Sequence, residues 1–137
     1  MRGVYVLVVS IDEPASLKVG RLGRLSFKKG LYAYVGSSQV GLRARVARHL
    51  RRNKKRFWHI DYLLGSGVGS VVRVFWKEGE KTEECRLAGV LAKRGVPVLR
   101  FGCSDCRCRS HLFRIRSCGF LGEFMRELHL KRARSVR

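Results

Sequence analysis

The pattern of apolar and polar positions predicts a strand from Leu31 to Val35. Aromatic and aliphatic residues alternate along this segment. Because side chains of a strand point to alternate faces, Tyr32 and Tyr34 would share one face of it. Gly36 then ends the pattern. A tyrosine-bearing strand is therefore expected to lead into the next element of the fold.

After this strand the period of the pattern changes to that of a helix. Apolar residues recur at every fourth position from Leu42 to Leu50, as expected for one buried stripe. Arg45, His49 and Arg52 lie at positions i, i+4 and i+7, and therefore share another face of the same helix. The helix is expected to present guanidinium and imidazole groups together.

Similar patterns predict the other elements of the chain. They are a strand at 3–11 that is apolar on both faces, a hairpin inserted at about 17–29, a strand at 71–76, a helix from 82 that stops at 95, a strand at 112–116 and a helix at about 120–130. The expected fold class is α/β, of the α+β kind, with a small central antiparallel sheet flanked by helices. We expect a single domain over residues 1–130 and a basic tail at 131–137.

The net charge restricts the classes of partner. The chain has 137 residues, with 30 Lys and Arg against 10 Asp and Glu, and a formal net charge of +20. This balance favours a polyanion, because each phosphate that is neutralised releases a counterion; an anionic membrane surface is the weaker alternative. The longest apolar run, Val4–Ile11, is too short to cross a bilayer, and Asp12, Glu13 and Pro14 follow where a signal peptide needs small residues. We expect a cytoplasmic protein with no membrane partner.

A dense run of basic residues follows the predicted helix. It covers positions 51–56 and ends against the aromatic and apolar segment 57–64. Charge runs are commonly solvated helix ends, whereas the aromatic neighbours of this one favour contact with phosphates. The candidate nucleic-acid-binding residues are Arg48, Arg52, Lys54, Lys55 and Arg56.

Three cysteines and a histidine lie close together near the end of the chain. Cys103, Cys106, Cys108 and His111 have the spacing C-x2-C-x-C-x2-H, and four such ligands could close a structural zinc site. Ordinary buried thiols are one alternative. Disulfides are another, because few thermolabile amides hint at a hot-living source, in which intracellular disulfides occur. The cysteines that could pair are Cys85, Cys106, Cys108 and Cys118.

Two short motifs resemble the signatures of the GIY-YIG nuclease superfamily. Gly-Val-Tyr at positions 3–5 and Tyr-Val-Gly at 34–36 both lie on predicted strands, with valine in place of isoleucine, and the following helix carries the matching Arg45. Further segments are similar to the small Uri-type branch of that superfamily, so that the match covers most of the chain. They are Lys55, the run from Trp58 to Tyr62, Glu84 with Cys85, and the cysteine-rich stretch 101–112.

This resemblance implies a metal-dependent endonuclease that hydrolyses nucleic-acid phosphodiester bonds with one Mg²⁺ or Mn²⁺ ion. DNA would be favoured over RNA, with a role in repair or recombination and a repair-protein partner. By position, Tyr5 would be the phenol near the attacking water and Tyr34 its partner. Arg45 would bind the phosphate, and His49 matches a histidine found in some members. A free phenol with a pKa of about 10 is a poor base, so Tyr5 needs nearby positive charge to lower that value.

Glu84 is the expected metal ligand, although its position departs from the usual pattern. In many relatives the corresponding glutamate lies about one turn later, where this chain has Ala88 or Gly89. The Glu-Cys context favours Glu84, and the alternative is a carboxylate that only complements the helix dipole. Tyr5 could likewise be an ordinary sheet residue, and His49 an exposed one.

Two other functions compete with catalysis. One is a non-catalytic module that binds DNA or RNA on the same scaffold. The other is a zinc-stabilised protein associated with the ribosome.

Overall fold

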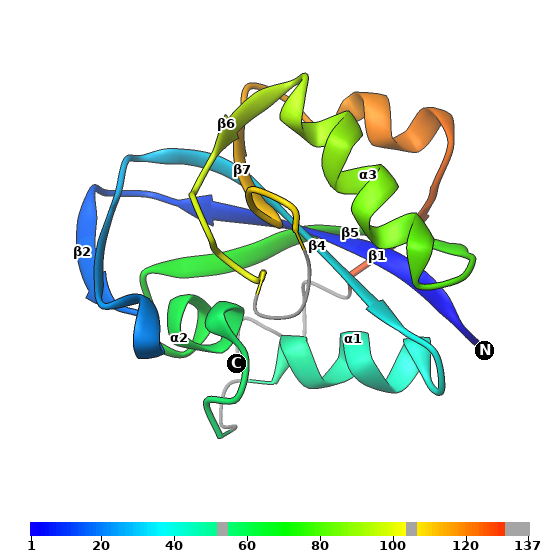
Figure 1. Cartoon of the computed structure of the whole chain (residues 1–137), viewed down its shortest axis with the longest axis horizontal. Helices are drawn as coiled ribbons and strands as arrows, with labels where there is room; N and C mark the ends of the chain where they lie inside the picture. The colour runs from blue at the N-terminus through cyan, green and yellow to red at the C-terminus, as the bar shows by residue number, and fades with distance from the viewer. Residues whose placement is uncertain (52–54, 104–106, 131–137) are drawn as a thin grey trace.

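The computed structural model describes residues 1–51, 55–103 and 107–130, and its centre is a six-stranded antiparallel sheet (Figure 1). In the order in which they lie, the strands are β6 (Gly95–Pro97), β7 (Leu112–Ile115), β4 (Gly30–Ser38), β1 (Gly3–Ile11), β5 (Gly69–Glu78) and β8 (Arg126–Leu128). The helices are α1 (Leu42–Leu50), α2 (His59–Gly65) and α3 (Thr82–Ala92), with short 3₁₀ helices η1 (Gly20–Leu22) and η2 (Gly119–Glu123). None of the helices in these described segments is both long and apolar enough to cross a membrane.

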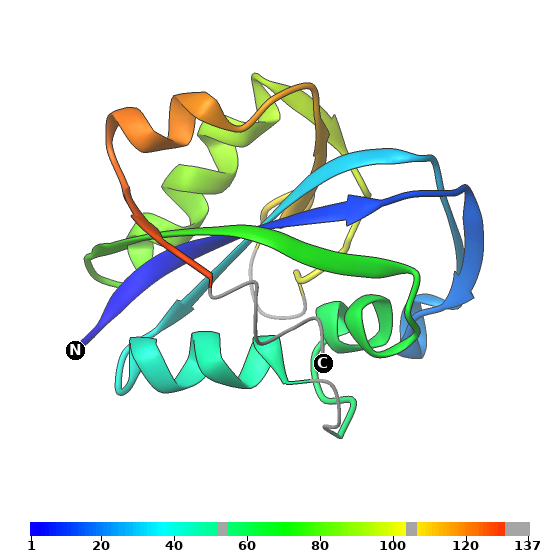
Figure 2. The ribbon, with the colours of Figure 1, turned by 180° about the vertical axis from the view of Figure 1, so that it is seen from behind.

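Helices cover both faces of the sheet (Figures 1 and 2). α3 and η2 lie on one face, and α1 and α2 lie on the other. Alternate residues of the central strand β1 enter two separate cores: Val4 and Val6 pack on the α3 side, whereas Tyr5 and Leu7 pack on the α1 and α2 side. A strand covered on both faces has no solvent-facing positions, which explains why β1 is almost continuously apolar. The predicted sheet flanked by helices is confirmed.

The tyrosines predicted to share a face of β4 do so. Tyr32 and Tyr34 belong to the core under α1 and α2, while Ala33 belongs to the core under α3. β1 and β4 are antiparallel neighbours, with Tyr5 opposite Gly36. Tyr5 and Tyr34 therefore leave adjacent strands on the same face, within reach of each other.

The helix predicted at about 120–130 is wrong. The segment instead forms η2 and then β8, which pairs with β5. Gly119 and Gly122 lower the helix propensity of its first half. The free edge of β5 offers backbone groups that β8 can satisfy, and this pairing overrides the apolar period of the sequence.

The chain after α3 forms an edge strand. α3 ends at Ala92, and Gly95–Pro97 pairs with β7 as β6. A Cβ atom on Gly95 would overlap the backbone carbonyl of Arg114, so glycine permits the close approach. Proline is tolerated here because an edge strand need not donate on its outer side.

A two-stranded hairpin lies where the sequence predicts an insertion. Its strands are β2 (Ala15–Lys18) and β3 (Arg24–Phe27), connected through η1. The hairpin packs against α2, and the backbone of Gly20, with a positive φ of 48°, lies beside the ring of Tyr62. The predicted basic tail, 131–137, lies outside the described residues.

Candidate active site

A pocket of about 430 Å³ collects residues from five elements, β1, β4, α1, α2 and α3. Tyr5 of β1, Tyr34 of β4, Arg45 of α1 and Glu84 of α3, all predicted from the sequence, line it. The pocket therefore depends on the tertiary fold rather than on any one segment. The other described residues that line it are Gly36, Ser37, Ser38, Gln39, Val40, Phe57, Trp58, His59, Lys81 and Gly102.

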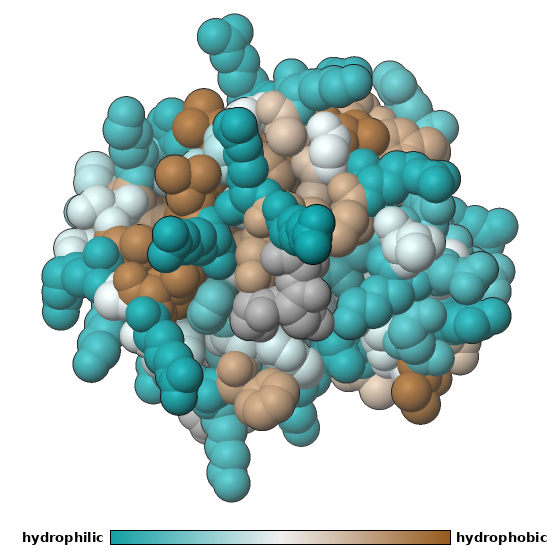
Figure 3. All heavy atoms as spheres, in the orientation of Figure 1, coloured by the Kyte–Doolittle hydropathy of each residue, from teal (hydrophilic) through white to brown (hydrophobic). Residues whose placement is uncertain are grey.

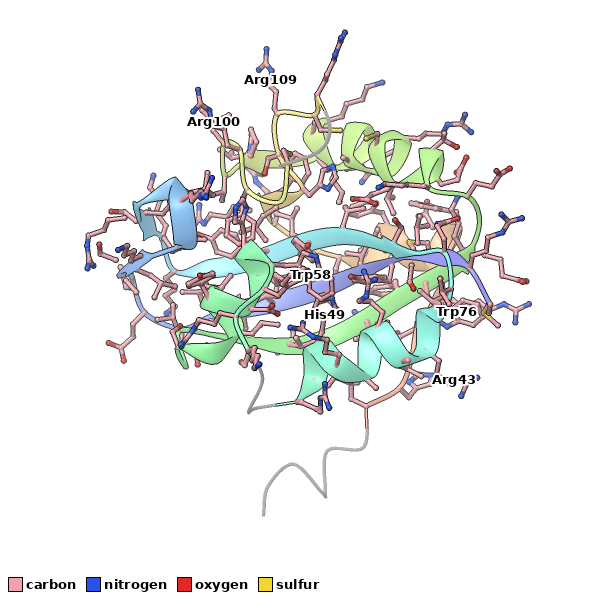
Figure 4. The ribbon with its side chains drawn as sticks, turned by 60° about the horizontal axis from the view of Figure 1, so that its bottom comes forward. Arg43, His49, Trp58, Trp76, Arg100 and Arg109 are labelled. Atoms are coloured by element: carbon pink, nitrogen blue, oxygen red, sulfur yellow. The ribbon has the colours of Figure 1, made fainter. Side chains whose placement is uncertain are left out.

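His49 is buried against the hydroxyl end of the Tyr5 side chain. The Tyr5 hydroxyl lies 2.7 Å from Nε2 of His49, and the two residues are 1% and 2% exposed. The His49 ring also packs against Tyr34 and Trp58, with centroid separations of 6.1 and 5.7 Å. Figure 4 shows His49 and Trp58 together between the sheet and the helices. An exposed surface position, the alternative considered for His49, is wrong.

Gly36 leaves the space that the Tyr5 hydroxyl occupies. A Cβ atom on Gly36 would overlap the oxygen and ring of the Tyr5 phenol. The two residues lie opposite each other across the β1–β4 pair. The tyrosine of the first motif and the glycine of the second therefore meet at one point.

Both pocket tyrosines remain neutral over the physiological range. Burial raises the pKa of Tyr5 far above its ordinary value of about 10, and the positive charge of Arg45 opposes this only in part. Burial also raises the pKa of Tyr34, and the nearby Tyr5 and Glu84 groups act in the same direction. Arg45 alone does not lower the pKa of Tyr5 enough for an anionic base. A base role for Tyr5 needs proton transfer to His49 or a further cation.

Arg45 is held at the pocket by two interactions. Its Nη1 atom donates a hydrogen bond to the carbonyl of Ser37 at 3.0 Å, and its guanidinium carbon lies 4.4 Å from the centroid of the Trp58 ring. A guanidinium has five N–H donors, so the bond to Ser37 uses only part of its capacity. The arrangement orients a permanent cation toward any anion that enters the pocket.

Glu84 is an ionised carboxylate fixed by two hydrogen bonds. Oε1 accepts from the Ser37 hydroxyl at 2.5 Å, and Oε2 lies 2.8 Å from Nδ1 of His111. Burial acts to raise the pKa of Glu84, but the hydrogen bonds from His111 and Ser37 outweigh it and hold this pKa below its ordinary value. Because a carboxylate has about four lone-pair sites, it can still accept a metal ion at the pocket.

The structure distinguishes Glu84 from the positions one turn later. Ala88 is buried in the core beneath α3, and Gly89 is exposed and has open space around its Cα. Among the described residues that line the pocket, Glu84 is the only acidic one. The carboxylate of this pocket is therefore supplied by the first turn of α3.

Arg48 is engaged with an aspartate that the sequence did not single out. Its two terminal nitrogens contact both oxygens of Asp61 at 3.0 Å, and it donates to the carbonyl of Lys55 at 2.9 Å. Asp61 is fully buried and also accepts from the backbone N–H groups of Phe57 and Trp58. Burial acts to raise the pKa of Asp61, but these donors hold it below its ordinary value. This ion pair joins α1 to the start of α2.

The basic run gives three described side chains at the surface. Arg51, Lys55 and Arg56 are exposed, and Arg56 lies over the ring of Tyr62 at 5.8 Å. Arg52 and Lys54 lie outside the described residues. Contact of this run, and of Arg48, with nucleic acid stays a prediction.

His59 lines the pocket, although it was not predicted as a site residue. Its Nδ1 accepts a hydrogen bond from the N–H of Gly102 at 2.8 Å, and burial lowers its pKa. A neutral imidazole that accepts at Nδ1 carries its proton on Nε2. The Trp-His pair that resembles the Uri-type branch was the available signal, but only the fold shows where the ring lies.

The cysteine-rich segment contributes to a group that differs from the predicted one. Within residues 1–51, 55–103 and 107–130, the ligand atoms of Cys85, Cys108 and His111 lie within 4.8 Å of one another and could hold a metal ion. Cys103 is not part of this group, and its sulfur lies 3.5 Å from the carbonyl of Phe101. Cys106 lies outside the described residues. The metal-binding set therefore includes a cysteine from α3 that the local spacing did not indicate.

Comparison with known proteins returns one family. The model of a family described as "Domain of unknown function DUF123" matches residues 4–133. No curated protein and no solved structure matches the chain.

Proposed function

Since the chain belongs to the DUF123 family, whose description states no function, we propose its activity from the pocket: a metal-dependent endonuclease that hydrolyses nucleic-acid phosphodiester bonds. The observation that carries the proposal is the convergence of Tyr5, Arg45 and Glu84 on one pocket of a strongly basic chain. The resemblance to GIY-YIG nucleases of the Uri-type branch supports the same chemistry, because Tyr5, Tyr34 and Gly36 of its two tripeptides, together with Arg45, line the pocket.

The basic surface supports a polyanionic substrate. Acidic side chains number only a third of the basic ones, and hydrophilic side chains cover most of the face seen in Figure 3. We favour DNA over RNA, in the cytoplasm and in repair or recombination together with a repair protein. The choices of DNA and of process follow from the resemblance to the nuclease superfamily.

The donor atoms around Glu84 fit a hard divalent cation. Glu84 is ionised and its side chain is 15% exposed, and Tyr5, which carries a hydroxyl oxygen, lines the same pocket. Oxygen donors of this kind are those that Mg²⁺ and Mn²⁺ prefer. When bound, such an ion would lower the pKa of a coordinated water and stabilise charge on the phosphate.

Arg45 would bind and stabilise the phosphate. Its guanidinium is anchored by Ser37 and Trp58, so that little reorganisation is needed as negative charge develops on the phosphoryl oxygens. A planar fork of donors also suits two phosphate oxygens at once. Removing one such donor group costs about 10²–10³-fold in rate in other enzymes.

Tyr5 and His49 would move the proton. The neutral Tyr5 phenol can accept a proton from the attacking water only if it passes its own proton on, and Nε2 of His49, at 2.7 Å, is positioned to receive it. Burial of both side chains keeps bulk water from replacing this contact. Tyr34 packs beside His49 and limits the positions of its ring.

Cleavage of a substrate panel tests this proposal. The untagged chain is incubated with single-stranded, nicked, branched and duplex DNA and with matching RNA, in Mg²⁺, Mn²⁺ or EDTA. We expect metal-dependent cleavage that Arg45→Ala lowers by about 10²-fold or more. Arg43→Ala is the matched control. Arg43 is exposed on the same helix and does not line the pocket, and its substitution removes the same charge as Arg45→Ala does. Equal cleavage by wild type and Arg45→Ala would reject the proposal.

A binding module on the same scaffold is the second candidate, and the raised pKa of Tyr5 favours it. If protein charges cannot make the phenol a base, the pocket could bind phosphate without turnover. Tyr5→Phe and Glu84→Gln separate the candidates. For an endonuclease both changes abolish cleavage and leave the dissociation constant for DNA nearly unchanged, whereas a binding module shows no cleavage before either change.

A further inference from the structure

We propose that Cys85, Cys108 and His111 bind one zinc ion that joins the first turn of α3 to the segment preceding β7. This site goes beyond the proposed hydrolysis and does not depend on it. Its ligands differ from the local C-x2-C-x-C-x2-H set, because Cys85 comes from α3 and Cys103 is absent from it.

The distances between the three ligand atoms are close to those of a metal site. They lie within 4.8 Å of one another. With Zn–S bonds of about 2.3 Å, tetrahedral geometry places two sulfurs about 3.8 Å apart. The group therefore needs to contract by at most about 1 Å, which small rotations of two cysteine side chains supply.

The contact between Glu84 and His111 prepares the imidazole to be a ligand. Nδ1 of His111 lies 2.8 Å from Oε2 of Glu84. When Nδ1 donates to this carboxylate oxygen, the lone pair of the neutral ring is on Nε2. A carboxylate behind the non-ligating nitrogen is the usual support of metal-binding histidines, since it fixes both tautomer and ring orientation.

The ligand chemistry selects zinc rather than the ion proposed for hydrolysis. Two thiolates and an imidazole are soft or borderline donors, which suit Zn²⁺ and not Mg²⁺. His111 is 1% exposed, whereas Cys85 is exposed, so an ion can enter from the surface and become anchored inside. The fourth tetrahedral position is open to water or to another ligand.

Glu84 connects this site to the pocket without belonging to its ligand set. The same carboxylate touches His111 through Oε2 and Ser37 through Oε1. Zinc bound by His111 would hold the imidazole rigid and so fix the orientation of Glu84 at the pocket. The role of the ion is structural, because Cys85 and Cys108 do not line the pocket.

Metal analysis of the purified, untagged full-length chain tests the proposal. After dialysis against metal-free buffer, inductively coupled plasma mass spectrometry is expected to find one zinc ion per chain. Cys85→Ser and Cys108→Ser are expected to lower this ratio at least about tenfold, while Cys103→Ser, the matched control, retains it. Glu84→Gln keeps the shape of the side chain and is expected to weaken Zn²⁺ about 10–100-fold.

Titration of the metal-free wild type with Co²⁺ keeps the test independent of variants that fail to fold. Cobalt held by thiolates gives intense sulfur-to-metal absorption, which Zn²⁺ is expected to abolish by displacement. A wild type that shows no such absorption and retains no zinc overturns the proposal. So does loss of zinc in Cys103→Ser with retention in Cys85→Ser, or a disulfide between Cys85 and Cys108 found by mass spectrometry. None of these readouts involves nucleic acid. The zinc proposal can therefore fail without the endonuclease proposal failing, and the reverse also holds.

Discussion

Tyr34 shows how burial, more than any other cause, sets the protonation state of a residue in this pocket. Its side chain is 6% exposed, and burial raises the pKa of its phenol well above the ordinary value. In the unfolded chain the same phenol ionises near pH 10. Above that pH the unfolded state therefore binds fewer protons than the folded state, and folding stability falls as pH rises.

Tyr34→Phe removes this titration and leaves the ring. We expect wild-type stability to fall by up to about 1.4 kcal/mol more per pH unit above pH 10 than that of Tyr34→Phe, with no such difference below pH 9. Urea unfolding at pH 8, 10 and 11 measures it. Parallel pH profiles for the two proteins would show that Tyr34 ionises normally in the folded chain.

His49 gives a prediction for catalysis at the same scale. If His49 receives the proton of Tyr5, His49→Gln is expected to lower kcat/KM for the cleaved substrate about 10²-fold or more, and to do so mainly through kcat. Glutamine fills a similar volume and can still bond to the Tyr5 hydroxyl, but it does not take up a proton. Single-turnover cleavage measures the change, and an unaltered rate would exclude His49 from proton transfer.

Sequence motifs predicted these residues better than local patterns did. Tyr5, Tyr34 and Arg45 were placed by two tripeptides and a helical period, and the fold brings them to one pocket. Asp61 and His59 lie in the run from Trp58 to Tyr62 that resembles the Uri-type branch, but no pattern in the sequence assigned them a role, because their roles arise from partners elsewhere in the chain. A single aspartate in an aromatic run gives no sign that it will be fully buried against an arginine.

The elements α1 and α2 depend on one buried ion pair for their relative position. Asp61 of α2 has no exposed side-chain surface and accepts hydrogen bonds from Arg48 of α1 and from two backbone N–H groups before α2. Losing one partner of a buried pair leaves the other charge without compensation. The Arg48–Asp61 pair therefore stabilises the junction between α1 and α2 only while both charged partners are present.

Asp61→Asn is expected to lower the free energy of unfolding by about 3 kcal/mol. Urea unfolding at pH 7 measures the loss, with Asp12→Asn as the control, because Asp12 is exposed and bonds only to nearby Ser10 among the contacts described. In wild type the contribution of Asp61, whose pKa is held below its ordinary value, is present above about pH 4 and is lost as pH falls further. A loss similar to that of the control would show that the pair is replaceable.

Helices and strands were predicted correctly where the apolar positions of the sequence had one clear period. The prediction failed where pairing at a sheet edge determined the structure. β1, β4, α1 and α3 have strong patterns, and the structure contains them at similar positions. β8 was mistaken for part of a helix, since the apolar residues of the segment 120–130 also fit a helical period and only the vacant edge of β5 decides between the two. Short α2 lies in an aromatic run with no distinct period.

At the scale of the whole molecule the excess of positive charge controls association with nucleic acid. With a formal charge of +20 spread over 137 residues, phosphate contacts are expected from several elements at once. Arg100 and Arg109 project from the loop before β7 on the α3 side (Figure 4). Such contacts contribute affinity through counterion release and carry no sequence information by themselves.

Binding to duplex DNA is therefore expected to weaken steeply with salt. For about six phosphate contacts, raising KCl from 50 to 200 mM lowers the association constant about 10³-fold. Fluorescence anisotropy with a labelled duplex measures the slope, and a duplex of a different sequence should give nearly the same slope. Affinity independent of salt would mean that the charge is not used for this partner.

The contact between Gly36 and the phenol of Tyr5 means that the two tripeptides are not independent evidence in a sequence comparison. Because no side chain fits at position 36 while a tyrosine occupies position 5, the two sites form a single steric constraint. A side chain at position 36 is therefore expected only in related chains that no longer carry a tyrosine at position 5. A search that scores both motifs as independent matches therefore counts one physical fact twice, while Arg45, which comes from a separate helix, adds information of its own.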